Sequence, residues 1–280
     1  MLKFSIVLCT LNRPEILETC VKSLKAQLYK NFEIIIIDQS DNKNHRYINQ
    51  EPLFIYRHIM EKGLSNARNE AIKLASGDYI CLMDDDAEYD NDFLLKAQDS
   101  LIQNPVGIII GKVIDKLTGR PGAKGMSVDK IISVNEGNAF RYCMSPGMVI
   151  RTKTVKEIGF DNELGVGKRW GAGEETDLAL RFLYKGEKVM YNPRMLVYHP
   201  SLERDDIPVP KVFSYNLGFG ALYKKHISKY GKKKMYMEFS WWILRNVIGC
   251  ILFRIIGNES AAAYYDNSVK GKLLGFKEYK

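Results

Sequence analysis

Residues 1–115 alternate between short apolar runs and segments in which apolar residues recur at helical spacing, and this alternation is the strongest constraint on the fold. Predicted strands and helices are listed in chain order: strands at 4–10, 32–38, 54–58, 79–83 and 106–114, and helices at 15–27 and 65–75. A continuous apolar run such as 32–38 (FEIIIID) is typical of a parallel strand covered on both faces. The pattern therefore predicts an α/β fold with a mostly parallel sheet, in which ligands bind beyond the carboxyl ends of the strands.

Acidic residues follow two of these predicted strands. Asp38 ends one of them, and Asp84-Asp85-Asp86 follows the apolar run YICLM. Side chains two residues apart on an extended backbone share a face, so Asp84 and Asp86 can hold one divalent cation together. The alternative is a solvated acidic turn that caps the next helix.

Two other acidic motifs fit the sequence less well. An EF-hand loop beginning at Asp84 requires glycine at position 89 and glutamate at position 95, where the chain has Tyr89 and Leu95. An aspartyl-phosphate phosphatase normally has threonine or valine where the chain has Glu88. The EF-hand motif is therefore excluded, and the phosphatase motif is not matched at this position.

The remainder of the chain is less regular. We predict a long loop at 116–138, a strand at 145–150, a helix at 152–158, a flexible glycine-rich loop at 165–173, a helix at 174–185, and final strands at 188–191 and 196–199. Pro208 and Pro210 then mark a boundary. We expect one domain over 1–205, divided into halves 1–115 and 116–205, and a helical extension over 206–280.

Charge and cysteine content restrict the compartment and the partners. The net charge is +8, and residues 201–280 carry 14 lysines and arginines against 7 acidic residues, so the basic character belongs to the extension. The five cysteines are widely spaced, which suggests neither a disulfide framework nor a zinc site. The N-terminus lacks the features of a secretory signal, so we expect a cytoplasmic protein.

Four segments, in order, carry a family resemblance: VLCTLNRP, IIIIDQSDN, GLSNARNEAIKLASGDYICLMDDDAE and IGFDNELGVGKRWGAGEETDLALR. With them the chain resembles the inverting family 2 glycosyltransferases of the GT-A fold, over about residues 3–200. The resemblance implies a Rossmann-like, mostly parallel central sheet flanked by helices, followed here by a helical and basic C-terminal extension. It also implies metal-dependent transfer of a sugar, with inversion, to a hydroxyl group.

The resemblance assigns the donor side of the site. Asp38 is expected to read the base or the ribose of a UDP- or dTDP-sugar, and Arg68 to approach its diphosphate. The donor-binding residues that it implies are Thr10, Asn12, Arg13, Asp38, Asp41, Gly63, Arg68, Asp84 and Asp85. Asp84, Asp86 and His199 are the implied ligands of Mn²⁺ or Mg²⁺, although a single histidine is more often structural.

The acceptor side rests on the segment that contains Glu174 and Glu175. The family usually carries Glu-Asp here, with the second acid as general base; the longer Glu175 leaves either glutamate open for that role. Acids at a helix start are also favoured by the helix dipole alone. Trp170, Gly173 and Asp177 are the expected acceptor-binding residues, and Trp170 can instead anchor its loop.

The apolar stretch 235–257 is long enough to span a membrane, but Arg245 and Arg254 interrupt it. On a helix, one face would collect Trp241, Leu244, Ile248, Ile251 and Ile255. Lysines precede the stretch, so we predict a peripheral anchor on the anionic inner face of the cell membrane. The alternatives are packing on the catalytic domain or a homodimer through the C-terminal helices. Nucleic acid binding is not expected, because it would leave the apolar stretch unexplained.

Together these observations predict a glycosyltransferase of polysaccharide synthesis that acts on a glycan or a lipid-linked oligosaccharide. A nucleotidyltransferase and a catalytically silent nucleotide- or glycan-binding scaffold are the alternatives on the same fold.

Overall fold

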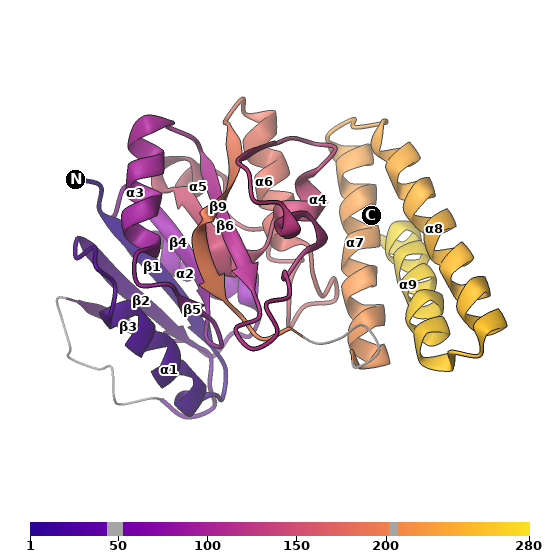
Figure 1. Ribbon diagram of the computed structural model, residues 1–280, viewed down its shortest axis with the longest axis horizontal. Coiled ribbons are helices and arrows are strands. Elements are labelled where there is room, and N and C mark those ends of the chain that lie inside the picture. Colours follow the sequence, from indigo (N-terminus) through magenta and orange to yellow (C-terminus); the bar gives the residue numbers. More distant parts are fainter. Residues whose placement is uncertain (44–52, 202–206) are drawn as a thin grey trace. The chain divides into compact units, whose positions relative to one another are not determined.

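The computed structural model of the chain describes residues 1–43, 53–201 and 207–280 (Figure 1). It separates into two compact units. The first unit contains Met1–Phe160 and Glu175–Ser201, and the second contains Asp161–Glu174 together with the C-terminal segment. The predicted boundary between residues 205 and 206 lies outside the described residues. The grouping also differs from the predicted division in the segment 161–174, which belongs to the second unit.

The first unit is built on one sheet, which has nine strands in the described part of the chain. Its order is β3-β2-β1-β4-β8-β6-β9-β5, with β7 paired to β9. The strands are β1 (Phe4–Thr10), β2 (Phe32–Asp38), β3 (Phe54–His58), β4 (Tyr79–Asp84), β5 (Glu88–Tyr89), β6 (Ile108–Ile114), β7 (Ile132–Val134), β8 (Met148–Arg151) and β9 (Val189–Tyr198). Strands β3, β2, β1 and β4 are parallel to one another, and β8 runs antiparallel between β4 and β6.

Helices flank this sheet, as predicted for the α/β class (Figure 1). They are α1 (Pro14–Lys25), α2 (Leu64–Leu74), α3 (Phe93–Gln103), α4 (Ala139–Tyr142), α5 (Thr152–Ile158) and α6 (Glu174–Tyr184), with short 3₁₀ turns η2 (Lys124–Ser127) and η3 (Ser145–Gly147). Every side chain from Ile34 to Ile37 is fully buried, which explains why β2 is apolar throughout rather than alternating.

Strand register brings the sequence-predicted residues to one edge of the sheet. Thr10 at the end of β1 pairs with Asp38 at the end of β2. On the other side of β1, Cys9 pairs with Asp84 at the end of β4. The carboxyl ends of three adjacent parallel strands therefore place polar side chains side by side.

Several elements differ from the sequence prediction. The predicted loop 116–138 contains η2 and β7, and β7 pairs with β9. The two predicted final strands form the single strand β9, whose pairing with β6 shifts register after Gly111. Helix α3 and the two-residue strand β5 were not predicted. The helical spacing of the buried residues in 93–103 carried a signal for α3.

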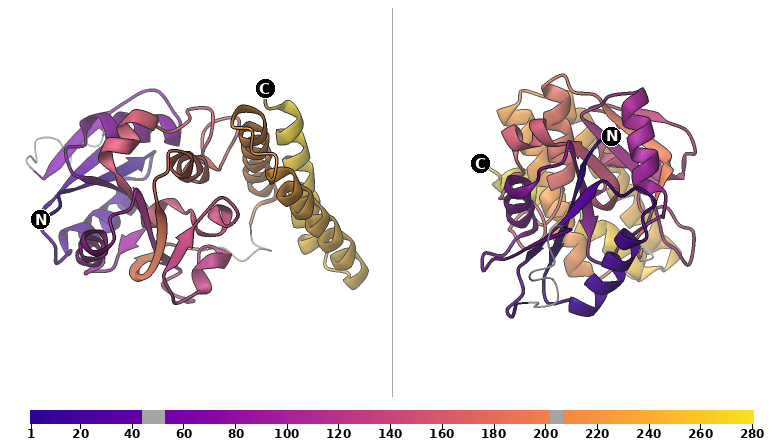
Figure 2. Two further views of the ribbon diagram at one scale, coloured as in Figure 1. Left: turned by 90° about the horizontal axis from the view of Figure 1, so that it is seen from above. Right: turned by 90° about the vertical axis from the view of Figure 1, so that its left-hand side faces the viewer.

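The second unit contains three long helices: α7 (Val209–Lys229), α8 (Met235–Ile256) and α9 (Glu259–Glu278). Helix α9 packs against both α7 and α8, and the three helices lie together in each view (Figures 1 and 2). A Cβ atom at Gly275 would lie 2.9 Å from the backbone nitrogen of Ala221, so only glycine permits this approach of α9 to α7. Between α8 and α9, the rings of Phe239 and Phe276 stack with centroids 4.5 Å apart.

The glycine-rich segment predicted as a flexible loop forms neither a helix nor a strand, but it is packed against α7 and α9. Asp161 accepts an ion-paired hydrogen bond of 2.7 Å from Lys225 of α7. A Cβ atom at Gly218 of α7 would lie 2.6 Å from the nitrogen of Ala172. The small side chains therefore allow close backbone packing here, and the expectation of flexibility from glycine content was wrong for this part of the loop.

Candidate active site

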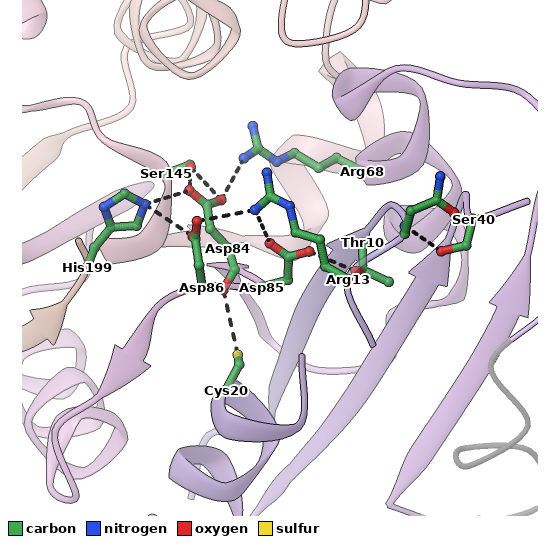
Figure 3. Close-up of polar contacts among 11 residues, drawn as sticks. Thr10, Arg13, Cys20, Ser40, Arg68, Asp84, Asp85, Asp86, Ser145 and His199 are labelled. Atoms are coloured by element: carbon green, nitrogen blue, oxygen red, sulfur yellow. Dashed lines mark hydrogen bonds and ion pairs between the residues drawn. The ribbon is translucent and has the colours of Figure 1, made fainter. Parts of the chain in front are cut away.

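Asp84, Asp86 and His199 form a cluster at the carboxyl edge of the sheet (Figure 3). Asp84 is the last residue of β4, and His199 directly follows β9. One ligand atom from each residue lies within 4.8 Å of the others. His199 Nε2 is 3.2 Å from Asp86 Oδ1 and 4.0 Å from Asp84 Oδ2. The sheet therefore brings His199 to two acids that lie more than 100 residues earlier in the sequence.

The electrostatics of this cluster favour the ionised form of Asp86. The hydrogen bond from His199 lowers the pKa of Asp86, against the opposing effect of burial. Burial alone would lower the pKa of His199, but the hydrogen bond to Asp86 and the charges of Asp84 and Asp86 outweigh it and raise that pKa. Two carboxylates and an imidazole, all partly exposed, are a suitable ligand set for a hard or borderline divalent ion.

Asp84 has further partners that hold its carboxylate in place. Ser145 donates to both of its oxygens, at 2.9 and 3.2 Å. Arg68 Nη2 lies 3.3 Å from Oδ1, and the Arg68 side chain is almost fully buried with its guanidinium over the ring of Phe160. The structure thus brings Arg68 to the acid cluster. Ser145 was missed, because nothing in the sequence around it distinguishes this serine from the other serines of the chain.

Asp85 lies in the turn that follows β4 and has partners different from those of Asp84. Its Oδ2 accepts a 2.7 Å hydrogen bond from Thr10, and its Oδ1 is 3.0 Å from Arg13 Nη1. The same Arg13 nitrogen lies 3.2 Å from Asp86 Oδ2, so one guanidinium joins two acids (Figure 3). Burial raises the pKa of Asp85. Thr10 and Arg13 therefore connect the end of β1 to the acids after β4.

Asp38 is almost fully buried at the end of β2. It accepts hydrogen bonds from the backbone nitrogen of Ser40 at 2.8 Å and from the Tyr56 hydroxyl at 2.6 Å. These bonds fix the orientation of its carboxylate beside Thr10.

The turns after β1 and β2 are joined by side chains. Asn12 adopts a left-handed backbone (φ 57°), and its amide donates to Asp41 at 3.0 Å. Lys62 Nζ lies 3.0 Å from the other oxygen of Asp41, and these hydrogen bonds from Lys62 and then Asn12 lower the pKa of Asp41. Gly63, with φ 124°, directly precedes α2. Lys62 is a further basic residue at this edge that the sequence analysis did not identify.

The two candidate bases open helix α6. Glu174 is 4% exposed, whereas Glu175 is more accessible. Burial and, after it, the charge of Glu175 raise the pKa of Cys143, so the Glu175 carboxylate lies near this thiol. Cys143 is two residues before Ser145, the hydrogen-bond donor to Asp84. This places Glu175 close to the segment that supports the acid cluster.

The predicted acceptor residues are all buried. Asp177 is fully buried, and its Oδ2 accepts a 2.7 Å hydrogen bond from Arg181 Nε and lies 2.6 Å from Arg181 Nη2. Trp170 is 5% exposed, with Arg169 4.8 Å from its ring centre and Tyr279 packed against it. Gly173 has φ 96° and directly precedes α6. Their burial favours structural roles for Asp177 and Trp170, and acceptor binding by these residues stays a prediction.

The site and the fold define a class: an α/β protein with an acidic cluster that could hold a metal ion, at the carboxyl ends of the parallel strands of a mixed sheet. Residues 5–158 match the family model described as glycosyl transferase family 2. Among curated proteins, the chain is 22% identical over 220 residues to a glucosyl-dolichyl phosphate glucuronosyltransferase of Haloferax volcanii, covering 72% of this chain and 70% of that protein. It is 26% identical over 221 residues to the amylovoran biosynthesis glycosyltransferase AmsB of Erwinia amylovora, covering 71% and 70%.

Solved structures agree on the fold. The chain matches S. aureus TarS 1-349 in complex with UDP with a TM-score of 0.60 at 16% identity, covering 97% of this chain and 90% of that one. It matches the mannosyltransferase PcManGT from Pyrobaculum calidifontis, in complex with GDP-Man and Mn²⁺, with a TM-score of 0.66 at 13% identity, covering 97% and 87%. The chain belongs to glycosyl transferase family 2 and has the GT-A fold.

Proposed function

We propose that the protein transfers a sugar from a nucleotide diphosphate sugar to a hydroxyl group of its acceptor, with inversion at the anomeric carbon. The observation that carries this proposal is the convergence of Asp84, Asp86 and His199 with two arginines at one edge of the sheet. Carboxylates that can hold a cation, next to guanidinium groups that can bind phosphate oxygens, suit a diphosphate leaving group.

We propose Mn²⁺ or Mg²⁺ as the cofactor, held by Asp84, Asp86 and His199. When bound, the ion would offset the charge that develops on the leaving diphosphate. Ser145 and Arg68 would keep Asp84 oriented toward it. The Mn²⁺ in the PcManGT complex supports a divalent ion in this fold.

The donor would lie across the ends of β1, β2 and β4. Asp38, held by Ser40 and Tyr56, would bind the base or the ribose together with Thr10, Asn12, Asp41 and Gly63. Arg68, Arg13 and the backbone near Asp85 would face the diphosphate. TarS complexes contain UDP or UDP-GlcNAc and PcManGT binds GDP-Man, which supports a nucleotide sugar without selecting its base.

Glu175 is our choice of general base over Glu174. A base must reach the proton that it removes, and Glu175 is the more accessible of the two. Its carboxylate would take the proton of the acceptor hydroxyl while that oxygen attacks the anomeric carbon. The bond between that carbon and the diphosphate oxygen would break on the opposite face, which inverts the anomeric centre.

We propose a glycan or lipid-linked oligosaccharide as the acceptor, and a peripheral position on the inner face of the cell membrane. Relatives support this by name: one acts on a glucosyl-dolichyl phosphate, and one belongs to amylovoran biosynthesis. Helix α8 is long and apolar enough to cross a membrane by length and composition. The predicted apolar face of α8 is exposed: Trp241 63%, Leu244 50%, Ile248 46%, Ile251 53% and Ile255 77%.

The test is release of nucleoside diphosphate from a panel of nucleotide sugars, with and without Mn²⁺. We expect Asp86→Ala and Glu175→Gln to lose roughly 100-fold or more in turnover, because each removes a group that acts on developing charge or on the transferred proton. Asp99→Asn, an exposed acid on α3, is the matched control and should keep full turnover. Full turnover in both site variants would contradict the assignment.

A further inference from the structure

A buried lysine lies where α7, α8 and α9 meet. Lys272 of α9 is 6% exposed, and its ammonium donates to the amide oxygen of Asn216 on α7. The same ammonium lies 5.6 Å from the ring centre of Trp242 on α8. A buried ammonium group normally has a carboxylate partner, because removing an uncompensated charge from water is costly. Here the amide oxygen of Asn216 is its hydrogen-bond acceptor.

A second cation contacts the same indole. The guanidinium of Arg245 is 5.4 Å from the ring centre of Trp242. Over residues 1–43, 53–201 and 207–280, the structure shows no carboxylate within ion-pair distance of Lys272 or Arg245. Burial and, after it, the charge of Arg245 lower the pKa of Lys272 to about 8. Two cations therefore gather on one aromatic ring without a compensating anion among the described residues.

An unpartnered hydrogen-bond donor follows Trp242 along α8. Asn246 lies one helical turn further on; it is 5% exposed, and within the part of the chain that the structure describes its Nδ2 has no hydrogen-bond partner. A lysine ammonium offers three N–H groups. The nearby polar groups are already engaged: Asn216 Nδ2 donates to Val212 O at 2.7 Å, and the Ser268 hydroxyl donates to Tyr264 O at 2.8 Å. The cluster lacks a group with negative charge and several acceptor oxygens.

We propose that Lys272, Arg245 and Asn246, around Trp242, bind a phosphate group. A phosphate group supplies the missing charge and enough oxygens for charge-assisted hydrogen bonds to all three residues. The inference concerns the second unit alone and does not depend on the catalytic assignment.

The surroundings of Arg245 favour a phosphate group carried by a lipid. Leu244 precedes Arg245 and Ile248 lies one turn further along α8, and both are about half exposed. Acyl chains attached to the phosphate would cover these apolar side chains, whereas a free phosphate ion would leave them in water.

The test measures the melting temperature of the full chain with inorganic phosphate, with short-chain phosphatidic acid, and with short-chain phosphatidylcholine. A ligand that binds the folded state raises the melting temperature. We expect a rise with phosphatidic acid and little with phosphatidylcholine, whose headgroup carries no net charge. Lys272→Met and Arg245→Gln should each lower the affinity for phosphatidic acid roughly tenfold or more, because each removes a charged hydrogen-bond partner. The lower affinity is observed as a smaller rise in melting temperature at the same lipid concentration.

Lys270→Met is the matched control, because it removes the charge of an exposed lysine on the same helix. It should respond like the original chain. Without ligand, Lys272→Met should melt no lower than the original chain, since it replaces a buried, uncompensated cation with an apolar side chain. Arg245→Gln changes an exposed residue, so it reports on binding independently of the buried position.

A response to both phosphate ligands would support a phosphate site that accepts a free ion, and a response to phosphatidic acid alone would support a lipid headgroup site. Equal responses to the two lipids, or equal responses in Lys270→Met and the two site variants, would overturn the proposal. So would the absence of any response to phosphate or phosphatidic acid.

Discussion

Two charged clusters differ in how their charges are compensated. The acid cluster of the first unit consists of Asp84, Asp85 and Asp86. The hydrogen-bond donor cluster of the second unit, called the donor cluster below, consists of Lys272, Arg245 and Asn246 around Trp242. Asp84, Asp85 and Asp86 all have cationic partners, from Arg13 and Arg68. Lys272 has an amide oxygen and a second cation beside it. The acid cluster is thus compensated by its own fold, whereas the donor cluster is not. Within the described residues, the carboxylates of the acid cluster therefore have partners of opposite charge, whereas the cations of the donor cluster have none.

The largest expected effect is on turnover, and it follows from removing Arg68, a cationic partner of the acid cluster. Arg68→Ala should lower turnover by roughly 100-fold or more, because it removes both a partner of Asp84 and a fork of donors for the diphosphate. Arg68→Lys should not restore it, since an ammonium cannot reproduce the fork. Turnover is measured by release of nucleoside diphosphate. Arg57→Ala, at an arginine paired with Glu70 on the surface, is the control; equal losses at both positions would show that general stability, not the site, was measured.

A smaller effect is expected from the residue that orients the ion-binding carboxylate. Ser145→Ala removes both hydrogen bonds to Asp84 and should weaken Mn²⁺ binding by roughly 10- to 100-fold, as for other residues that support metal ligands. Isothermal titration with Mn²⁺ measures it. Ser133→Ala, at an exposed serine of β7, should leave the affinity unchanged. An unchanged affinity in Ser145→Ala would mean that Asp84 is positioned without this serine.

The third prediction concerns stability against pH in the second unit. Burial and then the charge of Arg245 on α8 lower the pKa of Lys272 to about 8 from its ordinary value of 10.5. Between these pH values the unfolded chain binds the proton more readily than the folded chain, so this lysine makes stability rise with pH across that window. The gain should be roughly 1–3 kcal/mol.

Chemical unfolding at several pH values, compared with Lys272→Met, isolates this contribution, because the other titrating groups are common to both chains. The difference in stability between the two chains should shrink as pH rises from about 8 to about 10.5. A difference that is constant over the window would show that Lys272 keeps its ordinary pKa when folded.

The smallest effect is expected at the exposed face of α8. Trp241→Gln should weaken binding to anionic vesicles by roughly tenfold or less, since it removes one large apolar side chain from the face. Co-sedimentation measures it, with Leu117→Gln as the control at an exposed leucine of the first unit. A normal affinity together with concentration-dependent dimerisation that Trp241→Gln abolishes would identify the face as a homodimer interface instead.

Periodicity was sufficient to predict the parallel half of the fold. Strands β1 and β2 match their predicted bounds, because a strand buried on both faces is apolar at nearly every position. The edge strand β3 also matches its predicted bounds, although only Phe54 in it is buried. The acids at the strand ends followed from the same rule. By contrast, β7 and η2 lie in a segment with little periodicity, and their places depend on pairing with β9 and on packing that no local pattern encodes.

The residues that support the site were harder to predict than its candidate metal ligands. Asp84, Asp86 and His199 have distinctive chemistry, whereas Ser145 and Lys62 gain their roles only from where the chain folds. The loop 165–173 shows the opposite error: its glycines suggested flexibility, but they allow close packing against α7. Glycine content indicates that a backbone can be either flexible or closely packed, and tertiary contacts decide between the two.

The central claim is that Asp84, Asp86 and His199 form one divalent ion site. It is tested most directly by counting bound Mn²⁺ with electron paramagnetic resonance in the original chain and in Asp84→Asn, Asp86→Ala and His199→Phe, with UDP present and Asp99→Asn as control. We predict a single bound ion in the original chain and in the control, and strongly weakened binding in all three site variants. Undiminished Mn²⁺ binding in the three site variants would contradict the claim.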